Sequence, residues 1–248
     1  IHNGDMAEAL KHWRKSDFCS ITCGENANVC NKVEKMRECL QHLAKDYGIR
    51  SIETPYQFTL PNGHVLFKIE EATLSHETFK GGMTPEITRI NFERGDGVGV
   101  LLYAEEKDEV VLVEQFRYPV YASRSINDDC PTGWLLEIVA GIKDGEGHRV
   151  ARRELLEETG FELTKDLEHL TTFYLSPGGS SEQMELYLAH VKKADGIQPH
   201  TGLQSETEDI RTHTLPFSQA LQMIKDGRIR DAKTMIALML LRDQRKTA

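Results

Sequence analysis

The stretch that most constrains how this chain folds runs from residue 137 to residue 161, where an apolar segment leads into a glycine-rich turn and then into a run of acid. Glu157 and Glu158 lie three and four positions after Glu154, so on an α-helix the three side chains point roughly the same way. Divalent ions such as Mg²⁺ take carboxylate oxygens as ligands, and a cation would relieve the repulsion between three like charges, so the pattern indicates a metal site. The alternative is a solvated acidic face, which is what most charge runs form.

The residues on either side of the acidic run predict where its helix lies. Residues 135–140 have the pattern of a buried strand end, Gly160 is placed to end the helix, and Phe161 resumes the apolar pattern. This order of strand, glycine loop and acidic helix resembles the Nudix box of the Nudix hydrolases, written G-x5-E-x7-R-E-U-x-E-E-x-G-U, with U a bulky apolar residue. Residues 153–161 match the second half of that pattern at every fixed position.

The first half of the box departs from the pattern. Counting from Gly141, the box has its first glutamate at position 147 and its Arg-Glu pair at 155 and 156. This chain has Gly147 instead and brings the pair two residues earlier, at Arg153 and Glu154. The resemblance makes Glu146 the substitute for the first glutamate, whose role in the family is to pair with the box arginine. We expect a shorter loop or a shifted helix start, with the metal-facing half intact.

The resemblance implies a metal centre. It places Mg²⁺, or Mn²⁺, on Glu154, Glu158 and the backbone carbonyl of Ala140, with Glu157 as a further ligand that is also a candidate catalytic residue. Divalent ions that bridge the oxygens of a diphosphate neutralise the charge that repels an attacking nucleophile. The box therefore implies hydrolysis of a pyrophosphate bond.

Arg117 follows the strand-like run 110–116 and is a candidate for diphosphate binding. Its planar guanidinium can donate two hydrogen bonds at once to a pair of pyrophosphate oxygens, which a lysine ammonium cannot match. A surface salt bridge is the alternative for an isolated arginine. The segment 114–119, Glu-Gln-Phe-Arg-Tyr-Pro, resembles the strand before the box in Nudix enzymes that act on nucleotide sugars, and this likeness favours contact with substrate or with a second subunit.

A glycine-rich loop after the box carries further candidates. Residues 176–182, Ser-Pro-Gly-Gly-Ser-Ser-Glu, would be an ordinary turn by themselves. They resemble the loop found after the box in ADP-ribose pyrophosphatases and their GDP-mannose-cleaving relatives. The resemblance makes Gly178, Gly179 and Glu182 candidate substrate-binding residues.

A second acidic cluster lies at residues 206–209. Acids in a loop are usually just solvated. The Glu-x-Glu-Asp-Ile form nevertheless resembles the mobile loop that, in the same branch of the family, brings a glutamate to the metal centre and to the attacking water. Glu206 and Glu208 remain alternatives for this catalytic role, which typically contributes ~10²–10⁴-fold to the rate.

The resemblance covers about residues 52–242 and implies hydrolysis of a nucleoside diphosphate sugar. The first expectation is ADP-ribose, cleaved to AMP and ribose 5-phosphate, and the alternative is GDP-mannose, cleaved to GMP and mannose 1-phosphate. A third hypothesis, from another class, is a regulator that binds nucleotide sugars without turnover. Retention of all three box acids favours the enzyme over the regulator.

Composition limits the partners of the chain. Its 248 residues carry a formal net charge of −9 at pH 7, which disfavours nucleic acid because nucleic-acid binders usually show a basic patch. No apolar run reaches the ~18 residues that cross a bilayer, and the N-terminus lacks a signal-peptide pattern, so we expect a cytoplasmic enzyme without a membrane partner. The five cysteines are expected to be free thiols rather than disulfides or zinc ligands.

The chain is expected to have three regions. Periodicity predicts a helical extension of unknown role over residues 1–50 and antiparallel strands, with a hairpin turn at Asn62-Gly63, over residues 51–95. The family resemblance implies that residues 96–248 form the Nudix domain. The strands and helices of the last region predict an α/β/α sandwich around a mixed sheet. The family resemblance implies a homodimer in which the N-terminal strands cross to the partner.

Overall fold

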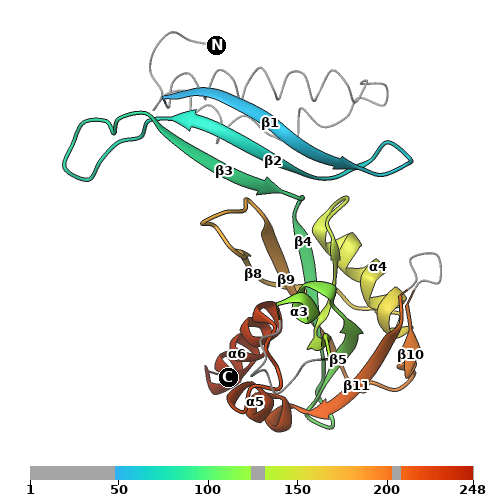
Figure 1. Ribbon diagram of the computed structural model, residues 1–248. Helices are drawn as coiled ribbons and strands as arrows, with labels where there is room; N and C mark the ends of the chain where they lie inside the picture. The colour runs from blue at the N-terminus through green and yellow to red at the C-terminus, as the bar shows by residue number, and fades with distance from the viewer. Residues whose placement is uncertain (1–47, 124–131, 203–207, 248) are drawn as a thin grey trace, which may run out of the picture. The chain divides into compact units, whose positions relative to one another are not determined.

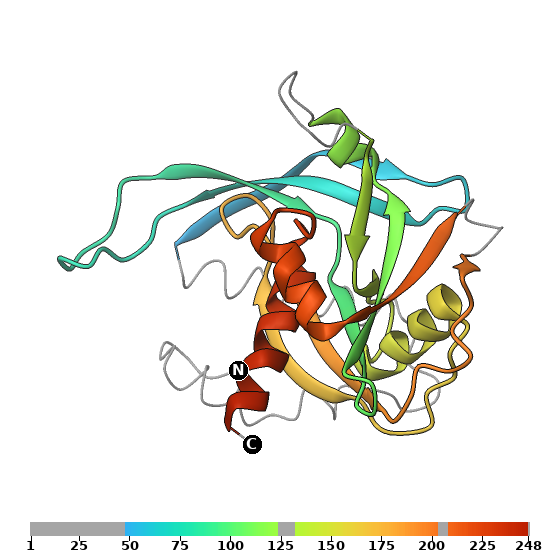
Figure 2. The same ribbon diagram turned by 90° about the horizontal axis from the view of Figure 1, so that it is seen from below.

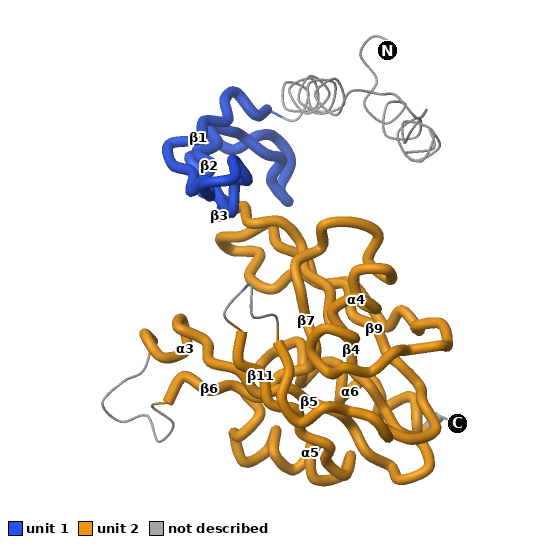
Figure 3. Tube along the Cα trace, turned by 90° about the vertical axis from the view of Figure 1, so that its right-hand side faces the viewer, with its two compact units in different colours: residues 1–92 blue, residues 93–248 orange. Residues whose placement is uncertain are grey.

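The computed structural model describes residues 48–123, 132–202 and 208–247 of the chain, the side chain of Thr247 excepted. The chain divides into two compact units, with the division between Phe92 and Glu93 (Figure 3). The predicted N-terminal helices and all five cysteines lie outside the described residues. Among the described helices, none is long and apolar enough to cross a membrane.

The first unit contains a three-stranded sheet in the order β1 (Ile49–Thr59), β2 (Val65–Leu74) and β3 (Ile87–Glu93). The antiparallel β1 and β2 are joined at the predicted Asn-Gly turn, where the backbone N–H of Leu60 donates to His64 O at 2.8 Å. Gly63 has a φ of 85°, a conformation that favours glycine. The predicted antiparallel strands are confirmed, and their role in dimerisation stays a prediction.

The second unit is built on a mixed sheet (Figure 1). Its strand order is β10-β11-β5-β4-β9-β8, with β6 paired to β5 and β7 paired to β4. The central pair β4 and β9 is parallel, and β4 and β5 are antiparallel. The strands are β4 (Gly97–Ala104), β5 (Glu109–Phe116), β6 (Trp134–Glu137), β7 (Val139–Ile142), β8 (Glu168–Tyr174), β9 (Gln183–Val191), β10 (His200–Thr201) and β11 (Ile210–Pro216).

Helices cover both faces of this sheet (Figures 1 and 2). Successive strand residues point to opposite faces, so Val100 and Leu102 of β4 pack in the core cluster that contains α4 (Gly147–Thr159). Leu101 packs instead in the cluster that contains α5 (Phe217–Lys225) and α6 (Ala232–Thr247). A short helix, α3 (Tyr118–Ala122), follows β5. The predicted α/β/α sandwich around a mixed sheet is confirmed.

The strand segments β6 and β7 switch partners, and this switch positions the candidate site. Leu136 and Glu137 pair with β5, whereas Val139 and Ala140 pair with β4. Ile138, at the switch, donates its backbone N–H to Thr234 Oγ1 on α6 at 2.8 Å. The hydroxyl thereby satisfies a buried backbone donor that would otherwise carry a penalty. Glu137 and Ala140 are held on either side of this anchored residue.

Candidate functional site

The acidic helix is α4, and its sequence explains where it lies. Its last two turns consist mainly of strong helix formers, alanine, arginine, leucine and glutamate. Val150, Ala151 and Leu155 are buried against the sheet. Gly160 ends the helix in the left-handed conformation, with φ 67°, and its N–H donates to Leu156 O at 2.8 Å. The predicted glycine stop is therefore confirmed.

Glu158 is the most enclosed of the predicted acids, with 3% of its surface exposed. It accepts a hydrogen bond from the backbone N–H of Ala140, and its Oε2 has no hydrogen-bond partner within the described part of the chain. Burial raises the pKa of the Glu158 carboxyl well above its usual range, and the charges of Glu154 and Glu208 raise it further. A buried polar atom without a partner is rare in folded proteins and indicates that a ligand is expected there.

Glu154 lies one helical turn before Glu158, against the glycine that begins the box. A Cβ placed on Gly141 would lie 2.1 Å from Glu154 Cδ, so glycine is the residue that leaves room for this carboxylate. Burial raises the pKa of Glu154, whereas a hydrogen bond from Arg153 opposes that rise. Glu157 and Glu208 also raise it through their charges. Glu154, Glu158 and Glu208 thus share one electrostatic environment.

The second acidic cluster is only partly described. Glu206 lies outside the described residues, whereas Glu208 is half-buried and close enough for its charge to raise the pKa of both Glu154 and Glu158. Gly202 helps bring it there, because a Cβ at Gly202, which has a φ of 107°, would lie 2.8 Å from the Glu208 carbonyl oxygen. The choice between Glu206 and Glu208 stays open, with Glu208 placed beside the helix acids.

The box arginine has a different partner from the expected one. Arg153 Nη1 donates to both oxygens of Asp144, at 2.9 and 3.1 Å, and this pair lowers the pKa of Asp144. Glu146 instead pairs with Arg149 at 3.1 Å, one turn along the helix. The expectation that Glu146 pairs with Arg153 is therefore wrong. Asp144 takes that role because the shortened loop carries it, and not Glu146, toward the arginine.

Glu157 is less buried than the other two helix acids, with 29% of its side chain exposed. Its Oε2 lies 3.8 Å from Arg153 Nε. It is on the same side of the helix as Glu154 and Glu158, as the spacing predicts, but nearer the solvent. Its predicted role as a further ligand or catalytic residue stays a prediction.

Arg117 reaches the site from the end of β5. Its Nε donates to Glu137 Oε2 at 2.9 Å, its Nη2 lies 2.7 Å from the same oxygen, and 37% of its side chain remains exposed. The positive charge of Arg117 lowers the pKa of Glu158 against the dominant effect of burial. The arginine therefore lies within electrostatic reach of the acidic helix, as expected for a group that binds the diphosphate beside a metal.

The glycine-rich loop follows β8. Gly178 and Gly179 are exposed in a turn in which the N–H groups of Gly179 and Ser180 donate to Ser176 O at 3.1 and 3.0 Å. A Cβ on either glycine would meet nothing within 4 Å. Glu182 is largely buried, and its Oε1 lies 3.8 Å from Arg94 Nε. Burial raises the pKa of Glu182. The substrate-binding role of these three residues stays a prediction.

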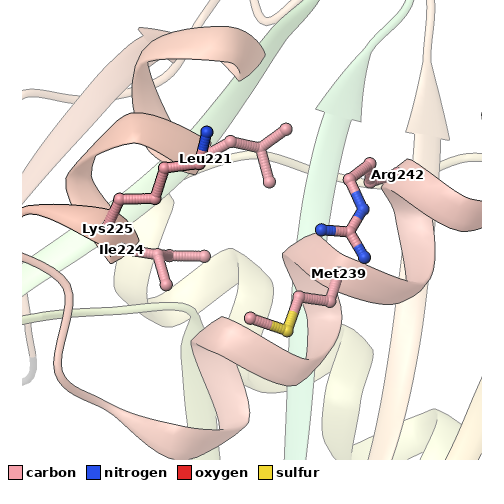
Figure 4. A pocket seen from close by; sticks show the side chains of 5 residues that line it. All are labelled: Leu221, Ile224, Lys225, Met239 and Arg242. Atoms are coloured by element: carbon pink, nitrogen blue, oxygen red, sulfur yellow. The ribbon is translucent and has the colours of Figure 1, made fainter.

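A shallow pocket lies elsewhere in the second unit, on α5 and α6. Figure 4 shows the side chains that line it, Leu221, Ile224, Lys225, Met239 and Arg242. None of them belongs to the predicted site, and the pocket offers no carboxylate to a metal ion. We therefore place the candidate site at α4, β7 and the end of β5.

Three residues of the site were missed at the level of sequence. Asp144 pairs with the box arginine, and Glu137 and Lys233 form an ion pair of 2.9 Å beside Arg117. An acid between two apolar residues of a buried strand, as at Glu137, is a signal that sequence reasoning can use. Lys233 gives a weaker signal, a lysine inside the pattern Asp-x-Lys-Thr at a helix start.

The residues at the site fit a divalent cation. Glu154, Glu158 and the carbonyl of Ala140 offer the oxygen donors that Mg²⁺ and Mn²⁺ prefer, and among the described residues Glu158 Oε2 is buried without a hydrogen-bond partner. Within the described ranges, no group of three His, Cys, Asp or Glu side chains is already arranged to hold a metal ion. Glu154 accepts a hydrogen bond from Arg153 Nη2 at 2.8 Å.

Known proteins are similar to this chain in sequence and in fold. An ADP-ribose pyrophosphatase of Escherichia coli strain K12 is 37% identical over 202 residues, which cover 81% of this chain and 92% of that protein. A GDP-mannose pyrophosphatase of Yersinia pestis strain Pestoides F is 36% identical over 173 residues, which cover 69% of this chain and 83% of that protein. A crystal structure of an ADP compounds hydrolase covers 80% of this chain with a TM-score of 0.55 at 20% identity, which supports the fold.

The family model of the NUDIX domain matches residues 93–238, a range that contains the sandwich, the acidic helix and Arg117. Since this match covers more than half of the chain and agrees with the site described above, the chain belongs to the Nudix hydrolase family.

Proposed function

We propose that the protein hydrolyses the pyrophosphate bond of a nucleoside diphosphate sugar, with ADP-ribose as first substrate and AMP and ribose 5-phosphate as products. The observation that carries this proposal is the buried, partly unpaired carboxylate of Glu158, which lies within electrostatic reach of Glu154, Glu208 and Arg117. Acids that hold a cation and an arginine that binds a diphosphate are the two elements that this hydrolysis needs.

Each residue has a separate task in this proposal. Glu154, Glu158 and the Ala140 carbonyl would hold Mg²⁺, with Mn²⁺ as a substitute and Glu157 as a further ligand. The chemistry that a divalent ion held there would supply is neutralisation of charge on the diphosphate oxygens. Arg117 binds the diphosphate. Glu208, or Glu206, accepts a proton from the water that attacks one phosphorus, and the bond from that phosphorus to the bridging oxygen breaks. Water and substrate thus give two phosphomonoesters.

Two alternatives rest on specific observations. The relative that acts on GDP-mannose is 36% identical, almost as similar as the relative that acts on ADP-ribose, so GDP-mannose is the second substrate candidate. A regulator that binds nucleotide sugars without turnover would need the same Arg117, but not the metal-facing acids. The chain has both metal-facing acids, Glu154 and Glu158, and Gly141 leaves room for the Glu154 carboxylate. These features support an enzyme over a binding regulator.

The first prediction concerns substrate and metal. Purified protein incubated with Mg²⁺ and a panel of nucleoside diphosphate sugars is expected to release two phosphomonoesters, fastest from ADP-ribose, and EDTA is expected to abolish that release. Chromatography of the products measures both results and gives the order of substrates. Faster cleavage of GDP-mannose would replace ADP-ribose in the proposal. Tight binding without turnover of any member of the panel would establish the regulator instead.

The second prediction concerns Gly141. In Gly141→Ala the new Cβ would lie within 2.1–2.5 Å of the Glu154 carboxyl atoms, so that group must move away from the site. We expect kcat/KM to fall ~10–100-fold, as when a metal ligand loses its support, while the melting temperature changes little. Gly145→Ala is the matched control, because its Cβ would meet only Val150 Cγ2, at 3.8 Å. Equal activity of the two variants would contradict the placement of Glu154.

A further inference from the structure

A buried carboxylate beside Arg117 holds two cations at once. Glu137 is 3% exposed. Its Oε2 accepts a hydrogen bond from Arg117 Nε and lies 2.7 Å from Arg117 Nη2, and its Oε1 accepts a hydrogen bond from Lys233 Nζ at 2.9 Å. Both oxygens of the carboxylate are therefore engaged, one by each cation. The two oxygens belong to one rigid carboxylate. The bond from Lys233 to Oε1 therefore fixes the direction in which Oε2 faces Arg117.

Lys233 is fixed from the other side by the start of α6. It is 7% exposed, and its Nζ also donates to Asp231 Oδ1 at 2.9 Å. The other oxygen of Asp231 accepts the backbone N–H of Thr234 at 2.9 Å and the Thr234 hydroxyl, and that hydroxyl oxygen accepts the N–H of Ile138. The lysine is thus part of a chain of bonds that ties α6 to the point where β6 passes into β7.

The charges in this network are balanced. Arg117 and Lys233 carry two positive charges, and Glu137 and Asp231 carry two negative charges. A buried ion pair is weak evidence for stability, since its desolvation offsets the attraction, but removal of one partner leaves an uncompensated buried charge. The network therefore holds the Arg117 guanidinium in one orientation. This effect does not depend on how much the network contributes to the stability of the fold.

The guanidinium of Arg117 has donors left for a ligand. An arginine carries five N–H donors, and Glu137 takes the edge formed by Nε, which donates to Oε2, and Nη2, which lies 2.7 Å from the same oxygen. Among the residues that the structure describes, the edge formed by Nη1 and the other Nη2 hydrogen stays available, on a side chain that is 37% exposed. An edge of this kind binds two phosphate oxygens in parallel. Because the guanidinium is planar and rigid, the contact of its Nε side with Glu137 also fixes the direction of this free edge.

The network also reaches the glycine-rich loop. Burial raises the pKa of Glu182, and the positive charges of Arg94 and Lys233 oppose that rise. Lys233 therefore lies close to a second predicted substrate-binding residue as well as to the partner of Arg117.

We propose that Lys233 is a positioning residue for substrate binding, which acts through Glu137 to orient the guanidinium of Arg117 toward the diphosphate. The proposal rests on the proposed function, because it takes the diphosphate as the ligand of Arg117. It assigns a task in that reaction to a residue on α6, 116 positions after the arginine that it orients.

A double-mutant cycle tests this role. We expect Lys233→Met to lower kcat/KM for ADP-ribose ~10–100-fold, because small misplacements of a binding group have effects of this size. The loss should appear mainly as a raised KM, since Arg117 contacts the diphosphate before and during the reaction. In an Arg117→Ala background the same substitution is expected to change kcat/KM less than ~3-fold, because its effect passes through the missing side chain. Additive effects in the cycle would overturn the proposal.

Controls separate positioning from folding. Arg245→Met removes another cation of α6, which pairs with Asp108 at 2.7 Å, and should lower the melting temperature without altering KM. If Lys233→Met does not fold, Lys233→Gln, which keeps a donor but no charge, takes its place in the cycle. If the wild type cleaves no nucleotide sugar, the proposed function fails. The cycle is then measured on the dissociation constant of ADP-ribose, where additivity again overturns the proposal.

Discussion

Glu158→Gln is expected to reduce kcat by about three orders of magnitude while the protein stays folded. The substitution keeps the shape of the side chain but removes a negative charge from the centre of the site, and losses of one preorganised electrostatic contact at an active site are typically ~10²–10³-fold. Burial already raises the pKa of the Glu158 carboxyl, so a neutral amide at this position removes a charge that the fold alone disfavours. The melting temperature in EDTA should therefore be unchanged or higher.

Steady-state kinetics with ADP-ribose and Mg²⁺ measure the expected loss of kcat, and thermal unfolding in EDTA measures the melting temperature. Glu162→Gln is the matched control, because Glu162 is an exposed glutamate just beyond the same helix and its substitution should leave both values unchanged. A second readout is the rise in melting temperature that Mg²⁺ causes in the wild type, which the variant should lose. Turnover near the wild-type rate in Glu158→Gln would show that Glu158 does not hold the metal.

Local sequence patterns were sufficient where the structure itself is local. The helix spacing placed Glu154 and Glu158 on one side of α4, Gly160 marked the end of that helix, and the Asn62-Gly63 pair marked the hairpin. Each of these features depends on residues within one or two turns of one another. The mixed sheet followed from the order of strands and helices, because few arrangements bury both faces of such a sheet.

Long-range partners could not be read in the same way. Glu137 and Lys233 are 96 positions apart, and their contact exists because α6 packs over the switch between β6 and β7. Arg117 lies within electrostatic reach of Glu158, and its substrate-binding role stays a prediction, but its carboxylate partner Glu137 lies on a strand after the 124–131 segment. The pairing of Arg153 with Asp144 was also missed, since spacing in a shortened loop does not fix which acid faces the helix.

The glycine that replaces the first glutamate of the box now has a physical explanation. A Cβ on Gly147 would lie 1.8 Å from Glu185 Oε2 and 2.6 Å from the hydroxyl of Tyr187. Glu185, on β9, accepts hydrogen bonds from Tyr187 at 2.8 Å and from Lys143, and these bonds lower its pKa although burial opposes them. The space that a side chain at position 147 of α4 would occupy is thus filled by the Glu185 carboxylate of β9.

Gly147→Ala is accordingly expected to destabilise the protein by about 1–3 kcal/mol, the range for overpacking at a buried site. At the first position of a helix alanine is otherwise no worse than glycine, so the same substitution should cost nearly nothing in a background that carries Glu185→Ala and Tyr187→Phe. Urea unfolding of the four proteins measures both costs, and Gly145→Ala, whose Cβ would meet only Val150 Cγ2, controls for the loss of glycine. Equal costs in the two backgrounds would show that Glu185 and Tyr187 do not enforce the glycine. A loss of unfolding free energy that occurs only in the wild-type background would show that Glu185 and Tyr187 of β9 fill the space at position 147. The residue at this position of the box must then be glycine.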